Sequence, residues 1–276
     1  MPNWAYSLNT LTAKTDTAKK QLHEFIKKHL VFSKARSFMG SNIEVNSKSI
    51  IPLPDGIAKL EKMTELLFHD DGSFEQNPNY DKNAYEAQRK ANIEQYGYED
   101  WYDFCVAEWG SKWGLCNTTF YNDFDEEINT LEEITEILDE KGYIKFKAAT
   151  AWSPAIGLLQ KICELYPDIE LRCEWGEEQV TEYYGLLTYN KTDGGREYGR
   201  KDIEVGEAYD MLDRLGLVNK DDDDGYYPNY ESGLVEYDSH RDKDSEDYVP
   251  LYEEPTALGC EQKAIGCDPK EISCEN

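Results

Sequence analysis

The chain has 276 residues, and its 56 Asp and Glu against 29 Lys and Arg give a formal net charge of −27 at neutral pH. A surface this negative repels nucleic-acid phosphates, so we expect no direct binding of DNA or RNA. Aromatic residues make up 13% of the chain, which excludes a wholly disordered protein, and no apolar run approaches the ~20 residues that cross a bilayer.

The first fifty residues predict a strand, a helix and a second extended segment. Trp4, Tyr6 and Leu8 alternate with polar or small neighbours, which is typical of a half-buried strand. Thr15 and Asp16 can cap a helix whose apolar face runs from Leu22 to Leu30. Residues 43–45 and Ile50-Ile51 indicate extended chain that closes at Pro52 and Pro54.

Residues 55–113 are predicted to be a helical insertion. One helix is expected to carry Leu60, Met63, Leu66 and Leu67 and to end at the polar turn 69–73. A second helix is expected from Lys82 to about residue 95, followed by an aromatic-rich stretch. Residues 118–121 then have the composition of a strand.

The next segment predicts a second strand–helix–strand unit. Thr130 and Glu133 form a capping box, and Gly142 can end that helix in the left-handed conformation. A strand is expected at 143–146, and Ser153-Pro154 indicates a capped helix start.

Two further strands, 169–173 and 183–189, are expected to be the last of the chain, with a hairpin-type turn at Asp193-Gly194. A helix at 205–217 is expected to precede acidic, tyrosine-bearing loop. We therefore divide the chain at residue 200.

Three phrases carry a family resemblance, namely Pro2-Asn3-Trp4, Trp109-Gly110-Ser111-Lys112-Trp113-Gly114 and Thr150-Ala151-Trp152-Ser153-Pro154. In this order they resemble the YubB-type ferredoxin-like family of bacteriophage and plasmid proteins, over residues 1 to about 190. The resemblance implies an α+β fold with a ferredoxin-like βαββαβ core and a helical insertion. It also implies a protein of mobile-element origin, but no activity. The acidic C-terminal extension that follows has no counterpart in this family and is predicted from composition alone. Because the first residues lack the basic and then apolar stretches of a secretory signal, we expect the protein in the cytoplasm of a bacterial host. We interpret Trp109, Trp113 and Trp152 as structural, because buried aromatic side chains commonly stabilise cores.

Motifs for catalysis or cofactors are missing from the sequence. It has no phosphate-binding loop, dinucleotide fingerprint, paired zinc histidines or nucleophile elbow, so we predict no catalytic residues, no cofactor and no metal. Residues 220–231 approach a calcium loop, with Gly225 and Glu231 in place, but Lys220 replaces the first ligand. We therefore expect no EF-hand there.

The C-terminal segment combines acid with tyrosine. Residues 201–276 hold 22 Asp and Glu against 7 Lys and Arg, whereas the first 60 residues hold 9 basic and 4 acidic groups. The simplest interpretation is a solvated, solubilising segment. Its seven tyrosines raise the alternative of an interface that docks on a basic, DNA-binding protein, because tyrosine is enriched in interfaces. The residues predicted to contact this partner are Asp221, Asp222, Asp223, Asp224, Tyr226, Tyr227 and Glu231.

Three functional hypotheses remain open. The first is a non-enzymatic protein that binds a host DNA-handling protein, such as a defence nuclease, and blocks its access to DNA. The second is a self-assembling structural protein, a homo-oligomer with Cys260, Cys267 and Cys274 near a subunit contact. The third is an enzyme of unrecognised type. The simpler interpretation is that all seven cysteines are free thiols, some of them buried, and that the spacing of the last three is a coincidence.

Overall fold

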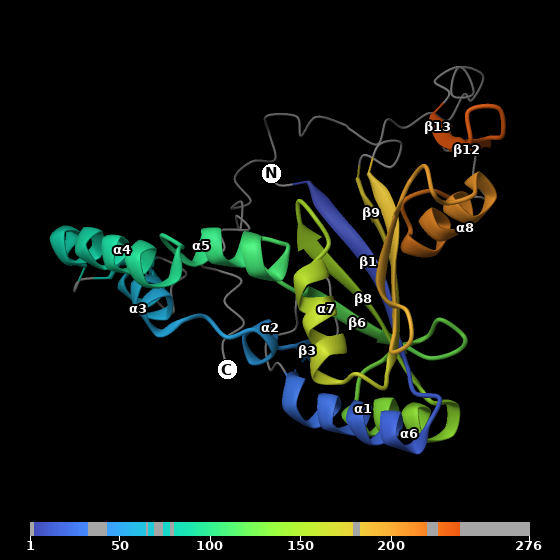
Figure 1. Cartoon of the computed structure of the whole chain (residues 1–276), viewed down its shortest axis with the longest axis horizontal. Coiled ribbons are helices and arrows are strands. Elements are labelled where there is room, and N and C mark those ends of the chain that lie inside the picture. Colours follow the sequence, from blue (N-terminus) through green and yellow to red (C-terminus); the bar gives the residue numbers. More distant parts are fainter. Residues whose placement is uncertain are drawn as a thin grey trace.

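The computed structural model describes residues 3–32, 43–64, 66–68, 74–77, 80–178, 183–219 and 226–237. Its centre is an antiparallel sheet of seven strands in the order β11-β10-β9-β1-β8-β6-β7 (Figure 1). The strands are β1 (Trp4–Thr12), β6 (Cys116–Tyr121), β7 (Glu127–Ile128), β8 (Tyr143–Ala151), β9 (Glu170–Glu177), β10 (Tyr184–Asn190) and β11 (Gly194–Gly199).

The middle of this sheet is the predicted ferredoxin-like core. In chain order it reads β1, α1 (Asp16–His29), β6, β8, α7 (Ile156–Leu165) and β9, which is βαββαβ. The four strands lie side by side as β9-β1-β8-β6, so each strand–helix–strand unit spans one strand of the other unit. The structure is therefore of the α+β class, and its core confirms the ferredoxin-like prediction.

The main hydrophobic core lies between one face of the sheet and three helices: α1, α6 (Leu131–Lys141) and α7. Leu11 of β1 and Phe146 of β8 point into it and meet Phe25 of α1 and Leu159 of α7. The first residues of α1 and α6 follow the sequence signals. Thr15 Oγ1 accepts from Ala18 N–H at 3.1 Å, and Thr130 Oγ1 accepts from Glu133 N–H at 3.2 Å.

The opposite face of the sheet is covered by α8 (Val205–Leu215), which contacts β9, β1 and β10 (Figure 1). Because successive strand residues point to opposite faces, Leu8 of β1 joins this second core although Leu11 belongs to the first. Beyond α8 lies a hairpin of β12 (Tyr226–Asn229) and β13 (Leu234–Tyr237). The predicted division at residue 200 falls between β11 and α8.

The described elements of the segment between α1 and β6 are β2 (Leu30–Phe32), β3 (Ile43–Val45), α2 (Ser47–Ile50), α3 (Asp55–Thr64), β4 (Leu66–Phe68), β5 (Phe74–Gln76), α4 (Lys82–Tyr96), α5 (Trp101–Phe104) and the π-helix η1 (Cys105–Trp109). Within this segment, the part that holds α3 and α4 extends away from the sheet, whereas β3 contacts β6 (Figure 1). The predicted helical insertion is thus present, with a short hairpin inside it. No helix in the described ranges is long and apolar enough to span a membrane.

Two predictions before residue 80 are wrong in part. Ile43–Val45 is a strand as predicted, but Ile50 ends a helical turn that begins at Ser47, because Asn46 Oδ1 accepts from Ser49 N–H at 3.2 Å and caps this turn. The first insertion helix ends at Thr64, and Leu66–Phe68 pairs as a strand with Phe74–Gln76. A short apolar run suits either state, and the backbone pairing decides between them.

Two further predictions fail after residue 150. Ser153 does not cap α7, whose N-cap is Ala155; its hydroxyl donates instead to Gly110 O at 2.6 Å. Strand 184–190 is not the last, since β11, β12 and β13 follow it. The turn at Asp193-Gly194 is confirmed, with Gly194 at φ +71° and Asn190 Oδ1 accepting from Asp193 N–H at 2.7 Å.

Candidate functional site

The hairpin β12–β13 carries the described part of the predicted partner surface. Tyr226 and Tyr227 lie in β12, and Glu231 is exposed in the connecting turn. The ring of Tyr226 lies 5.1 Å from that of Tyr237 across the hairpin. Asp221–Asp224 lie outside the described residues, as do Cys260, Cys267 and Cys274.

The turn of this hairpin presents its side chains in a defined geometry. Asn229 Oδ1 accepts from the backbone N–H of Glu231 at 2.9 Å and of Ser232 at 3.3 Å. Gly233 takes φ +72°, which only glycine adopts without strain. Tyr230 is 73% exposed and Tyr237 is 45% exposed, so acid and tyrosine stand together at the surface.

Glu231 is followed by a strand where an EF-hand would require a helix. β13 begins at Leu234 and pairs back onto β12, with Tyr226 opposite Tyr237. Within the ranges that the structure describes, no group of three or more metal-ligating side chains occurs.

The hairpin is attached to α8. Val235 of β13 is fully buried against the α8 side chains that form the second core. Tyr209 of α8 donates from its hydroxyl to Tyr226 O at 3.0 Å. The position of the hairpin therefore depends on how α8 is fixed to the sheet.

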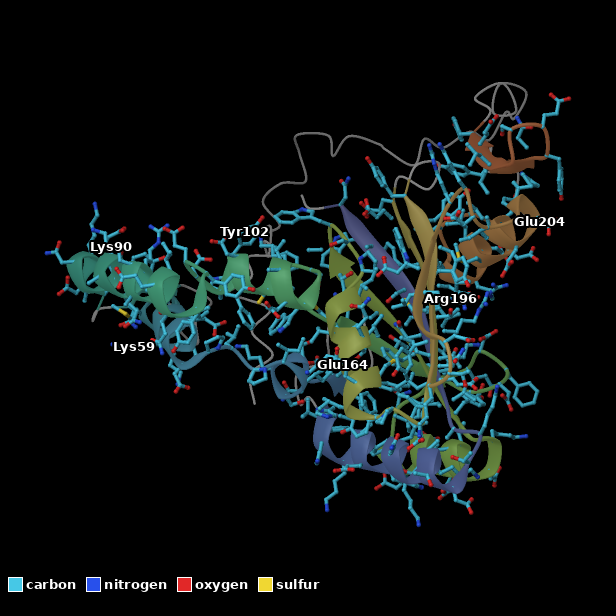
Figure 2. All side chains as sticks on the ribbon, viewed as in Figure 1. Lys59, Lys90, Tyr102, Glu164, Arg196 and Glu204 are labelled. Carbon is cyan, nitrogen blue, oxygen red and sulfur yellow. The ribbon has the colours of Figure 1, made fainter. Side chains whose placement is uncertain are left out.

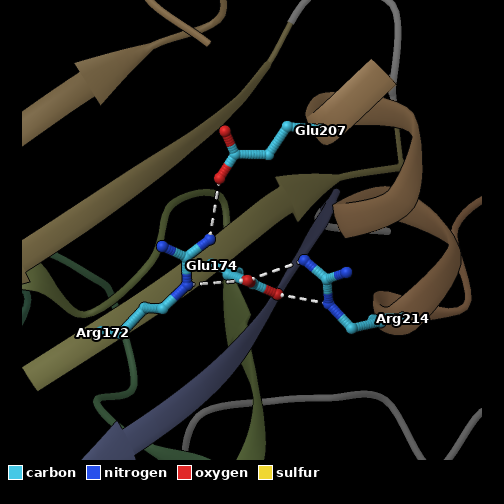
Figure 3. Close-up of polar contacts among 4 residues, drawn as sticks. All are labelled: Arg172, Glu174, Glu207 and Arg214. Atoms are coloured by element: carbon cyan, nitrogen blue, oxygen red, sulfur yellow. Dashed lines mark hydrogen bonds and ion pairs between the residues drawn. The ribbon is translucent and has the colours of Figure 1, made fainter. Parts of the chain in front are cut away.

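A buried carboxylate fixes α8 (Figure 3). Glu174 of β9 is 5% exposed, and its two oxygens accept from Arg214 of α8 at 2.8 and 2.9 Å. Arg172 Nε donates to the same carboxylate at 2.9 Å, and Arg172 Nη2 reaches Glu207 of α8 at 3.0 Å. The hydrogen bond with Glu174 raises the pKa of Arg214 above its ordinary value. Two strand residues and two helix residues thus form one charge network between β9 and α8.

Sequence reasoning missed a second acidic, aromatic surface at the β6–β7 turn. Phe124 is 82% exposed there. Asn122 Oδ1 holds the turn by accepting from Phe124 N–H at 2.9 Å and Glu126 N–H at 3.0 Å. The flanking exposed acids are Asp123, Asp125, Glu126 and Glu127, and α6 adds Glu132, Glu133, Glu136, Asp139 and Glu140. Asn122-Asp123 is a turn signal that could have indicated an exposed Phe124.

The three sequence motifs that carry the family resemblance contact one another in the folded chain. Trp152 N–H donates to Asn3 O at 2.9 Å, and the rings of Trp4 and Trp113 lie 5.6 Å apart. Lys112 Nζ lies 4.6 Å from the ring centroid of Trp113 and 5.1 Å from that of Trp152. We call Trp4, Tyr102, Lys112, Trp113 and Trp152 the aromatic cluster; Tyr102 belongs to it because its ring lies 5.8 Å from that of Trp152.

The structural interpretation of the tryptophans holds for two of the three. Trp109 and Trp113 are 4% and 7% exposed, and Trp109 Nε1 donates to Ile51 O at 3.0 Å. Trp152 is 41% exposed and is therefore no core residue. The hydroxyl of its neighbour Ser153 donates to Gly110 O, and this hydrogen bond links the motif at 150–154 to the motif at 109–114.

The described cysteines and His29 lie in the core. Cys105, Cys116, Cys163 and Cys173 are buried free thiols, as predicted for some of them, and burial raises the pKa of Cys163 to about 12. His29 is 4% exposed. A surface cavity of about 460 Å³ on α3 is lined by Asp55, Ala58, Lys59, Lys62, Met63 and Asn77, a set without histidine.

Comparison with known proteins supports the ferredoxin-like domain. Residues 120–214 match the family model described as the ferredoxin-like domain in Api92-like protein. This region runs from β6 to α8 and includes the Glu174–Arg214 pair. No curated protein matches the chain. A crystal structure of protein Api92 from Yersinia pseudotuberculosis aligns at 10% identity and TM-score 0.36, over 72% of this chain and 99% of that one.

Proposed function

We propose that this protein is a non-enzymatic binding protein whose acidic, tyrosine-bearing hairpin docks on a basic surface of a DNA-handling protein. The observation that carries the proposal is the β12–β13 turn, where Tyr230 is 73% exposed beside the exposed Glu231. Asn229 orders the backbone of the turn, so the backbone needs little further ordering on binding.

The electrostatics favour a basic partner. The net charge is −27, and residues 221–224, which precede β12 directly, are four aspartates. Opposite charge accelerates encounter and selects partners, while tyrosines supply apolar contact area with a polar tip. A partner whose DNA-binding groove is occupied by this surface would lose access to DNA.

The resemblance to proteins of bacteriophages and plasmids supports the biological setting of the proposal. A mobile-element protein gains by blocking a host nuclease or another DNA-binding defence protein. The host cytoplasm is the compartment in which such a partner acts.

The test is capture from bacterial lysates that express defence systems, at low and high salt, with partners identified by mass spectrometry. Two charge-matched variants accompany the wild type. One replaces Asp221, Asp222, Asp223 and Asp224 by Asn; the other replaces Glu127, Glu132, Glu136 and Glu140, on β7 and α6, by Gln. Each variant removes four negative charges, but from different surfaces.

The proposal predicts a DNA-binding partner that is retained at low salt, released at high salt and displaced by DNA. The aspartate variant should lose it, and the glutamate variant should retain it. If the glutamate variant alone loses the partner, the docking surface is the β6–β7 turn and the hairpin assignment is wrong. Retention of the partner by both variants would contradict an electrostatic mechanism.

A further inference from the structure

Trp152 combines exposure with backbone strain. Its φ is +72°, and its side chain is 41% exposed directly after β8. A bulky residue in the left-handed region is an outlier, and strained residues gather at binding sites. Two hydrogen bonds hold this conformation. The N–H of Trp152 donates to Asn3 O, and the hydroxyl of Ser153 donates to Gly110 O. Because the indole gains only partial burial in return, core packing does not account for a tryptophan at this position.

Lys112 lies beside this indole with its charge facing aromatic rings. Its Nζ is 4.6 Å from the ring of Trp113 and 5.1 Å from that of Trp152. In the part of the chain that the structure describes, Lys112 has no carboxylate partner. Ring faces attract an ammonium but accept its N–H groups poorly, so these donors remain available to an anion.

The aromatic cluster also contains a buried N–H group that has no hydrogen-bond acceptor among the described residues. Trp113 is 7% exposed, and its buried Nε1 has no acceptor among the described residues. Buried polar groups are normally hydrogen-bonded, and an orphan one requires an explanation. The ring of Tyr102, on α5, lies 5.8 Å from that of Trp152 and at 82° to it; Figure 2 shows Tyr102 on the insertion, between α4 and α7.

From this arrangement we propose that the aromatic cluster binds a nucleotide, with the base stacked on Trp152 and the phosphate on Lys112. A ligand for this surface must carry a flat ring and an anion at neighbouring positions, and a nucleotide provides both. Base-on-indole stacking with a nearby cation is a recurrent mode of nucleic-acid recognition. The net charge of −27 opposes a long polyanion far more than a single phosphate group, so the expected ligand is a mononucleotide.

The experiment is calorimetric titration of the full chain with adenosine monophosphate, adenosine, inorganic phosphate and a short single-stranded oligonucleotide. The proposal predicts saturable binding of the mononucleotide, tighter than that of adenosine or phosphate alone. Equal affinity for phosphate alone would overturn the nucleotide assignment in favour of a simple anion site. Tighter binding of the oligonucleotide than of the mononucleotide would overturn the mononucleotide assignment.

Two variants separate a binding role from a structural role. Trp152→Gly removes the stacking surface but suits φ +72°, so relief of backbone strain offsets part of the lost indole packing. The variant should therefore stay folded and bind the mononucleotide about tenfold more weakly. Lys112→Met should reduce the affinity for the mononucleotide to that for adenosine while leaving adenosine binding unchanged.

The proposal is overturned if the wild type shows no saturable binding at millimolar mononucleotide, or if both variants bind like the wild type. A marked loss of stability in Trp152→Gly would show that the indole is structural, and Lys112→Met then decides about the phosphate. The aromatic cluster and the hairpin share no residue, so these outcomes are distinguishable from failure of the proposed partner binding.

Discussion

Arg214 of α8 and Glu174 of β9 form a bidentate ion pair, with Arg214 Nε 2.9 Å from one carboxylate oxygen and Nη2 2.8 Å from the other. The carboxylate is buried, whereas the side chain of Arg214 is 43% exposed. This geometry ties the helix that carries the hairpin to the ferredoxin-like sheet, and it lies within the region matched by the family model.

Replacing Glu174 should destabilise the protein more than replacing Arg214. Glu174→Ala leaves two guanidinium groups without their shared acceptor, and we expect a loss of about 2 kcal/mol in the free energy of unfolding, below the value for a fully buried pair because both arginines are partly exposed. In Arg214→Ala the carboxylate keeps Arg172, so the loss should be about half as large. Urea unfolding measures both; a larger effect for Arg214→Ala would contradict this ranking.

Protonation of His29 should lower stability in mild acid. His29 Nδ1 lies 2.7 Å from Ser49 Oγ and Nε2 lies 2.8 Å from Tyr166 Oη. Ser49 Oγ–H donates to Asn46 O, so Nδ1–H donates to Ser49 and Tyr166 donates to Nε2, which requires a neutral ring. Burial, with a smaller effect of the Lys28 charge, lowers the pKa of His29 below 6.5.

A lowered pKa means that the folded state binds fewer protons than the unfolded state below about pH 6.5. The stabilisation is therefore complete above that pH and is lost as the pH falls through the lower, folded-state value. Denaturant unfolding of the wild type and His29→Gln between about pH 7.5 and pH 5 should show a free-energy difference that shrinks toward acid. A free-energy difference that does not change with pH would contradict a neutral His29 hydrogen-bonded to Ser49 and Tyr166.

Gly157 should not tolerate a side chain. A Cβ at this position in α7 would lie 2.2 Å from Glu108 O and 3.0 Å from the Trp109 carbonyl carbon, both in η1. Gly157→Ala is expected to cost about 2 kcal/mol or more, because backbone atoms cannot move aside cheaply. Gly195→Ala is the matched control, since its Cβ would meet only a Tyr189 ring atom at 3.8 Å. Thermal unfolding should separate the two variants clearly; equal midpoints would count against close packing of η1 on α7.

The four described cysteines should resist thiol reagents. Burial raises the pKa of Cys105, Cys163 and Cys173, so their thiols are protonated as well as shielded at pH 8. In a variant with Cys260, Cys267 and Cys274 changed to Ser, a coloured disulfide reagent should react only after the protein is unfolded. Rapid reaction of the folded variant with the reagent would show that these thiols are accessible to solvent and would contradict the prediction.

The sequence predicts the ferredoxin-like core well because its signals are local. The cap at Thr15, the capping box at Thr130 and the left-handed Gly142 each depend on a few neighbouring residues. Ser153 was mispredicted because its partner, Gly110, is distant in sequence, and a tertiary hydrogen bond replaced a local cap. The hairpin β4–β5 was missed because three-residue strands carry too little periodicity.

The candidate sites were harder to predict for a related reason. The many Asp, Glu and Tyr residues after residue 220 can be read from the sequence. The exposure of Tyr230, however, depends on the turn that Asn229 organises. The convergence of Trp4, Lys112 and Trp152 depends on the β1–β8 pairing, which places Trp4 opposite Ala151. No spacing within one segment contains this information.

The most direct test of the proposed function is the affinity of the captured, purified partner for the variant Tyr230→Ser/Tyr237→Ser, measured by calorimetry beside Phe124→Ser. Tyr230 and Phe124 are largely exposed, whereas Tyr237 is 45% exposed and packs on the ring of Tyr226. Thermal unfolding of both variants is therefore compared with that of the wild type before affinity is measured. The proposal predicts that the tyrosine variant binds the partner at least about tenfold more weakly, because a few aromatic side chains carry most of the binding energy of an interface. It also predicts that Phe124→Ser binds the partner like the wild type. Unchanged affinity of the tyrosine variant would contradict docking through the hairpin.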